Sequence, residues 1–139
     1  MNTVVDTSVW SLSLCRKPGD LNPTERAIVD ELAELIVEDR VCLIGVVRQE
    51  VLSGIRTQSQ FERLRSFLRA FQHLEISPAD HESAAQASNQ CQAKGITVSV
   101  VDALICAVAL NRDWAIFTTD NDFKLFTKIL SVNLHSPRK

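Results

Sequence analysis

The sequence lacks the features that mark secreted and membrane proteins. Its N-terminus, MNTVVDTSVW, has no basic region followed by an apolar core, which a signal peptide would have. The longest apolar stretch, from about Val100 to Leu110, is interrupted by Asp102 and is too short to cross a membrane as a helix. We therefore expect a cytoplasmic protein with no membrane partner.

Motifs for zinc, for nucleotide phosphates and for side-chain nucleophiles are also missing. The four cysteines form no CxxC pair, the four glycines are isolated, and no histidine pairs with a Ser or Cys in a recognisable motif. We expect the cysteines to be buried free thiols and the histidines to be structural or surface residues. These residues are Cys15, Cys42, Cys91 and Cys106, with His73, His81 and His135.

Length and patterning predict one α/β domain over residues 1–139. The chain of 139 residues is long enough for one core and too short for two ordinary domains. Short apolar segments alternate with helical patterns, which favours a parallel sheet of four to five strands with helices on both faces. The expected strands are 2–5, 41–44, 73–76, 115–118 and 130–134. Two helices are expected to follow the caps Thr24 and Ser59, and four more to start at residues 45, 80, 99 and 122. Residues 16–23 are expected to form a loop, and HSPRK at the C-terminus a loose tail.

Carboxylates stand where apolar strands give way to helices or in the first turns of helices. In a parallel sheet these junctions share one edge, so residues far apart in sequence should converge there. Several carboxylates cannot share a site as bare anions, because like charges raise each other's pKa. A divalent cation removes this conflict, and oxygen ligands suit Mg²⁺ or Mn²⁺. The residues are Asp6, Glu50, Asp102 and Asp120, with Asp122 close behind.

Each carboxylate also has a structural alternative. Asp6 fits a turn or an N-cap, and Glu50 fits a solvated helix face. Asp102 forms a capping box pattern with Ser99, and the helix dipole should keep it anionic. Either Asp120 or Asp122 fits an N-cap. The hydroxyls of Thr7 and Ser8 are placed to orient Asp6 or to hold a metal-bound water.

Four segments together resemble a PIN domain, and more narrowly a VapC-type toxin of bacterial toxin–antitoxin systems. They are VVDTSVW, a Glu in the helix after the second strand, SVVDALICAVAL and TTDNDF. The resemblance implies a three-layer α/β/α sandwich and a metal-dependent endoribonuclease that inhibits translation. It also implies catalytic Asp6, Glu50, Asp102 and Asp120, metal ligands Asp6, Asp102, Asp120 and Asp122, and the polar pocket residues Thr7, Ser8 and Thr118.

The expected chemistry is attack by water on an RNA phosphodiester, assisted by Mg²⁺ or Mn²⁺, because no His or Lys base lies near the carboxylates in sequence. The resemblance further implies a VapB-like antitoxin and a homodimer. Trp10, Leu12 and Leu14 are candidate groove, interface or core residues. Basic residues expected near the edge of the site are Arg48, Arg56, Arg112 and Lys124.

A silent binding module and a structure-specific DNA nuclease stay open as alternatives, whereas a receiver-like signalling module fits the sequence less well. A catalytically silent, Mg²⁺-binding α/β interaction module would keep the same fold, although every acidic position is filled here. A receiver-like signalling module would need an Asp after the third strand and a Lys after the last, and the sequence has neither. The net charge of −2 does not favour nucleic acid in bulk, but local patches attract phosphate more than net charge does.

Overall fold

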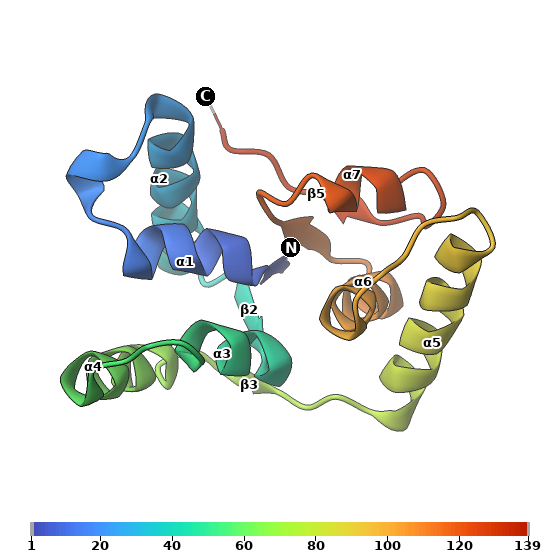
Figure 1. Ribbon diagram of the computed structural model, residues 1–139, viewed down its shortest axis with the longest axis horizontal. Coiled ribbons are helices and arrows are strands. Elements are labelled where there is room, and N and C mark those ends of the chain that lie inside the picture. Colours follow the sequence, from blue (N-terminus) through green and yellow to red (C-terminus); the bar gives the residue numbers. More distant parts are fainter. Residues whose placement is uncertain (1, 139) are drawn as a thin grey trace.

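The computed structural model describes residues 2–138 and has a parallel sheet at its centre (Figure 1). Its strands pair in the order β3-β2-β1-β4-β5, and every pair is parallel. The fully buried residues of β1 form the middle of the sheet, where β-branched side chains pack well. The strands are β1 (Thr3–Val5), β2 (Val41–Ile44), β3 (His73–Leu74), β4 (Ala115–Phe117) and β5 (Asn133–Leu134).

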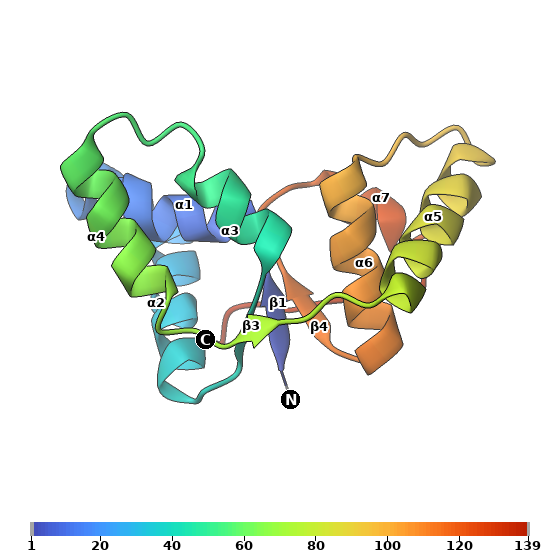
Figure 2. The same cartoon turned by 90° about the horizontal axis from the view of Figure 1, so that it is seen from below.

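Helices cover both faces of this sheet, which confirms the predicted three-layer α/β/α sandwich. The first four helices lie on one side of the sheet and the last three on the other (Figure 2). This division follows from right-handed crossovers, since the chain first builds outward to β3 and then returns to build β4 and β5. The helices are α1 (Thr7–Cys15), α2 (Pro23–Val37), α3 (Gly45–Leu52), α4 (Gln58–Leu68), α5 (Pro78–Gln92), α6 (Val100–Arg112) and α7 (Asp122–Phe126), with a 3₁₀ turn η1 (Pro18–Asp20).

Among the described residues, α1 is the helix that the sequence pattern did not predict. It carries apolar residues on several sides rather than in one stripe, so it shows no clear helical period. Trp10 is completely buried. Its ring packs edge-to-face against Phe67 of α4 and against Phe71, which lies just after α4, with a centroid distance of 5.2 Å to Phe71. Trp10 is therefore a core residue, whereas Leu12 is buried but lines a cavity.

The predicted caps of two helices were wrong by two residues. Asn22, not Thr24, caps α2 through a reciprocal capping box with Glu25, and Pro23 takes the first helical position. Thr57, not Ser59, caps α4 by accepting a hydrogen bond from the backbone of Gln60. In both helices the side-chain oxygen of the cap accepts a hydrogen bond from the backbone N–H three residues further on, which would otherwise have no partner. This bond decides where the helix starts.

A buried ion pair joins the start of α5 to the end of α6. The Asp80 carboxylate, 2% exposed, accepts two hydrogen bonds from Arg112, of 2.9 and 3.0 Å, and one of 3.0 Å from Asn111. It also closes a capping box with Ser77. Arg112 thus lies at the opposite end of α6 from Asp102, and its predicted place at the edge of the site is wrong.

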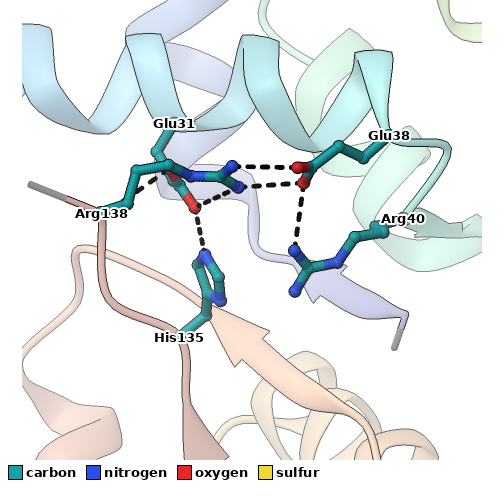
Figure 3. Close-up of polar contacts among 5 residues, drawn as sticks. All are labelled: Glu31, Glu38, Arg40, His135 and Arg138. Carbon is teal, nitrogen blue, oxygen red and sulfur yellow. Dashed lines mark hydrogen bonds and ion pairs between the residues drawn. The ribbon is translucent and has the colours of Figure 1, made fainter.

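The C-terminal segment is tied to α2 rather than loose, which corrects that prediction for residues 135–138. Glu31, 3% exposed, accepts hydrogen bonds from Arg138 and contacts the ring of His135 (Figure 3). Arg138 also pairs with Glu38, which in turn pairs with Arg40. Burial alone would raise the pKa of Glu31, but the hydrogen bonds from Arg138 and His135 outweigh it and lower that pKa.

The exposure of the four thiols agrees only in part with the prediction that all of them are buried. Cys42, Cys91 and Cys106 are buried free thiols as expected, but Cys15 is exposed at the end of α1. Burial raises the pKa of Cys42 to about 11, so this thiol stays protonated and inert.

Between residues 2 and 138, no helix has both the length and the apolarity needed to cross a membrane.

Candidate functional site

The site lies where the sheet changes its direction of growth. The chain builds from β1 to β2 and β3 on one side, and later adds β4 and β5 on the other side of β1. In open α/β sheets a crevice forms outside the carboxyl ends of the two strands at this switch point, here β1 and β4. Because Val5 pairs with Phe117, the residues that follow, Asp6 and Thr118, emerge side by side.

Asp6 is the most buried carboxylate of the site, at 5% exposure. Its Oδ2 atom accepts hydrogen bonds of 2.8 Å from Ser8 Oγ and of 2.8 Å from Thr118 Oγ1. Ser8 Oγ also accepts the backbone N–H of Thr119 at 3.0 Å, which fixes its orientation. Asp6 stands at the N-cap position of α1 but makes no side-chain capping bond, so its carboxylate is directed to the crevice network instead of the helix end.

Glu50 reaches the same network from α3. Thr7, the first residue of α1, donates a 2.6 Å hydrogen bond from Oγ1 to Glu50 Oε1. The helix carrying Glu50 begins at Gly45 directly after β2, with Ile44 at the N-cap and no side-chain cap. Although Glu50 is exposed, this hydrogen bond holds it beside the start of α1, so it is not simply a solvated helix residue.

Asp102 shows that the four carboxylates act on one another. Burial raises its pKa to about 6, and the negative charges of Asp6, Asp120 and Glu50 add to that rise. Its backbone N–H donates to Ser99 Oγ at 3.1 Å, which is the predicted cap at the start of α6. Burial and like charges therefore outweigh the helix dipole, which was expected to stabilise the anionic form of this carboxylate.

Asp120 lies in the turn after β4, on the other wall of the crevice. Its backbone N–H donates to Thr118 Oγ1 at 3.0 Å, and its Oδ1 accepts the backbone N–H of Asp122 at 2.9 Å. Asn121, rather than either aspartate, holds the N-cap position of α7. Asp122 is exposed and is not among the charges that raise the pKa of Asp102, so it lies at the margin of the cluster.

The donor set consists entirely of oxygen atoms, which is the chemistry that Mg²⁺ and Mn²⁺ prefer. The charges that act on Asp102 come from the carboxylates of Asp6, Asp120 and Glu50. A bound cation would relieve the repulsion between these carboxylates. Within residues 2–138, however, no three His, Cys, Asp or Glu side chains already stand at the spacing of a metal site. The carboxylates are nevertheless close enough for their charges to act on Asp102.

Two cavities flank the carboxylate cluster. The larger, of about 650 Å³, is lined by Ser8, Thr118 and Asp120 and extends over α1 and α2. The smaller, of about 410 Å³, is lined by Thr7 and Glu50 with residues of α3. The cluster therefore lies between two open spaces on the surface.

The basic residues that were expected at the edge of the site are distributed unequally. Lys124 lines the larger cavity as predicted, whereas Arg48 and Arg56 line neither of these two cavities. Arg16 also lines the larger cavity, and the sequence analysis missed it. Its position depends on α1 being a helix that ends at Cys15, and the sequence pattern did not reveal this helix.

Comparison with known proteins agrees with this architecture. The PIN domain family matches residues 3–129. Similar solved structures include FitAcB from Neisseria gonorrhoeae, with 21% identity, 97% of each chain covered and a TM-score of 0.74. VapBC2 from Rickettsia felis, bound to a DNA fragment from its promoter, shares 16% identity over 97% of this chain and 98% of that chain, with a TM-score of 0.74. VapBC-1 from nontypeable Haemophilus influenzae shares 17% identity over 100% of both chains, with a TM-score of 0.76.

At these identities the structural likeness establishes a shared fold over nearly the whole length of each chain. No curated protein matches the sequence. The assignment of a family therefore rests on the match over residues 3–129, together with the fold that the sheet order defines.

Proposed function

Because this chain belongs to the PIN domain family, we propose that it is a metal-dependent endoribonuclease and the VapC-type toxin of a toxin–antitoxin pair. The observation that carries the proposal is the placement of four carboxylates from four separate segments of the chain around one crevice. A structural role would need only one or two of them at helix ends, and the side chain of Asp6 makes no capping bond at all.

The proposed metal ligands are Asp6, Asp102 and Asp120, with Glu50 completing the shell or orienting water. Asp122 stays a weaker prediction as a ligand because of its marginal position. A bound Mg²⁺ or Mn²⁺ ion would supply Lewis-acid activation of water and stabilise the charge that develops on the phosphodiester. The oxygen donors fit such an ion, and its charge would offset the repulsion that raises the pKa of Asp102.

The surrounding hydroxyl groups would orient the proposed ligands. Ser8 and Thr118 both donate to Oδ2 of Asp6, which fixes the plane of this carboxylate. Thr7 does the same for Glu50. Residues that hold metal ligands in place typically contribute ten- to a hundredfold to metal affinity or activity. We therefore expect these hydroxyl contacts to matter for metal binding and cleavage.

The proposed partner is a VapB-like antitoxin that covers the site. Several structures with this fold are complexes described as VapBC or FitAB, and some of them hold DNA. These descriptions concern other proteins, and they support an antitoxin partner here through the common fold. A homodimer remains a prediction from the family resemblance.

Thr118→Val is expected to lower the rate of RNA cleavage roughly ten- to a hundredfold, the usual cost of losing a group that orients a metal ligand. Valine has the shape of threonine but cannot donate to Asp6 or accept from the backbone of Asp120. Thr97→Val is the matched control, since Thr97 is an exposed threonine that does not line the larger cavity and is not bonded to Asp6 or Asp120. Equal rates for both variants would contradict an orienting role.

The function is tested by incubating the purified chain with a panel of RNAs in Mg²⁺, in Mn²⁺ and in EDTA. The proposal predicts cleavage only with metal and products that carry 5′-phosphate and 3′-hydroxyl ends, as is usual when a metal ion assists the attack of water. Products with 2′,3′-cyclic phosphate ends would overturn the mechanism. Metal binding without cleavage of any RNA would favour the silent binding module instead.

A further inference from the structure

We propose that the larger cavity is the subsite for a nucleotide flanking the scissile phosphate, and that Lys124 binds the phosphate of that nucleotide. The inference rests on the proposed nuclease function and adds a binding residue to it. The cavity has a volume of about 650 Å³ and is lined by residues of α1 and α2 on one side and of the segment from β4 to α7 on the other.

The cavity is continuous with the carboxylate cluster. Ser8 and Thr118, which hold Asp6, form part of its wall, and so does Asp120. Asp6 itself is only 5% exposed, so a phosphodiester must enter the crevice to approach it. The nucleotide next to that phosphate then has to occupy one of the two flanking cavities.

The distribution of charge favours the larger cavity. Lys124 lines it, and among residues 2–138 the ammonium group of Lys124 has no hydrogen-bond or ion-pair partner. Arg16 on the opposite wall is already shared with Glu25 at 3.5 Å. The smaller cavity has Glu50 and no lysine or arginine in its described lining, so it offers a phosphate no positive charge.

The remaining lining suits a sugar and a base. Three apolar residues provide a surface for the flat face of a base, and nearby hydroxyls can hydrogen-bond to ribose and phosphate oxygens. The volume falls within the range of about 300–1,000 Å³ that is usual for small-molecule sites. The apolar residues are Leu12, Ile28 and Leu134, and the hydroxyl residues are Ser11, Thr24 and Thr119.

The first test measures RNA binding in an Asp102→Asn background, in which cleavage should be lost. The probe is a fluorescein-labelled, unstructured oligoribonucleotide of mixed sequence. Lys124→Glu should weaken binding roughly three- to tenfold and reduce the slope of log Kd against log salt by about one. Lys128→Glu is the matched control, because it makes the same charge change on an exposed residue of the same segment that does not line the cavity.

The second test uses the exposed thiol of Cys15 as a reporter of occupancy. Cys15 lines the cavity, whereas the other three cysteines are buried, so a water-soluble maleimide should react with Cys15 selectively. Bound RNA is expected to slow this reaction in the Asp102→Asn protein and to do so less in the Asp102→Asn, Lys124→Glu protein. The readout does not depend on catalysis.

Each outcome decides the proposal. Protection of Cys15 together with a loss of affinity specific to Lys124 supports it. Equal effects of the two lysine variants, or bound RNA that leaves Cys15 fully reactive, overturn the subsite while the nuclease function stands. If no RNA binds and the wild-type chain cleaves none, both the subsite and the proposed function are wrong.

Discussion

Asp102→Asn is expected to abolish RNA cleavage and, at the same time, to stabilise the metal-free protein above pH 6. Burial and three neighbouring carboxylates raise the pKa of Asp102 from 3.8 to about 6, so the folded state favours its protonated form. The stability that this group contributes is complete below pH 3.8 and is lost as the pH rises through about 6. Asparagine carries no charge and avoids this loss, but it removes a proposed metal ligand, and cleavage should fall by at least about a hundredfold.

The measurement is a thermal unfolding series in EDTA from below pH 3.8 to well above 6, with cleavage assayed in parallel. Asp102→Asn should unfold at a higher temperature than the wild type only in the upper part of this range. Asp30→Asn, which changes an exposed carboxylate of α2, is the control and should show no such divergence. A variant with normal cleavage, or one that is less stable than wild type above pH 6, would contradict the electrostatic account of the site.

Asp80→Ala is expected to lower the free energy of unfolding by about 3 kcal/mol, the usual cost of breaking a buried ion pair. Asp80 is almost fully buried and holds both Arg112 and Asn111, and it also closes the capping box of α5 with Ser77. Without this carboxylate the partly buried guanidinium of Arg112 has lost its partner, and the junction between α5 and α6 weakens. Denaturant unfolding of the variant provides the measurement.

Glu82→Ala, an exposed position on the same helix, is the matched control and should change stability little. The hydrogen bonds from Arg112 hold the pKa of Asp80 well below its ordinary value of 3.8. The corresponding stability is therefore present above that value and lost as the pH falls further. Equal stabilities of the two variants would show that the ion pair contributes nothing to joining α5 and α6.

The architecture could be predicted from the sequence because its signals are local and repeated. The centre of each predicted strand lies within one or two residues of the centre of an observed strand. Short apolar runs between polar turns are typical of buried strands, which is why the prediction succeeds. The convergence of Asp6 and Asp120 also followed from a general rule about parallel sheets, without any knowledge of loop geometry. What the pattern could not supply was the strand order, which depends on packing between distant helices.

The errors have specific physical causes. The helix α1 lacks a single apolar stripe because Val9, Trp10 and Leu12 are all buried, so the 3.6-residue period is hidden. Arg112 was expected at the edge of the site, but it pairs with Asp80, which lies 32 residues away in sequence. Such pairings are set by tertiary contacts, and no local pattern reveals them.

The size of the shift in the pKa of Asp102 was also beyond the sequence, although the clustering of carboxylates predicted its direction. Its position in the first turn of α6 suggested an anion stabilised by the helix dipole. The dipole contributes typically 0.3–1 kcal/mol, which is less than the combined effect of burial and three like charges. Only the structure shows how many carboxylates surround one position.

The central claim is that the crevice between β1 and β4 is a metal-dependent site for RNA cleavage, and Asp6→Asn tests it most directly. Wild-type and variant chains are compared for cleavage of the RNA panel and for the rise in Tm on addition of Mg²⁺ or Mn²⁺. Asparagine can still accept the hydrogen bonds from Ser8 and Thr118, so the variant should fold. We expect metal-dependent cleavage and a metal-dependent rise in Tm for the wild type, and neither for Asp6→Asn. Cleavage that persists in EDTA, or in Asp6→Asn, would contradict the account.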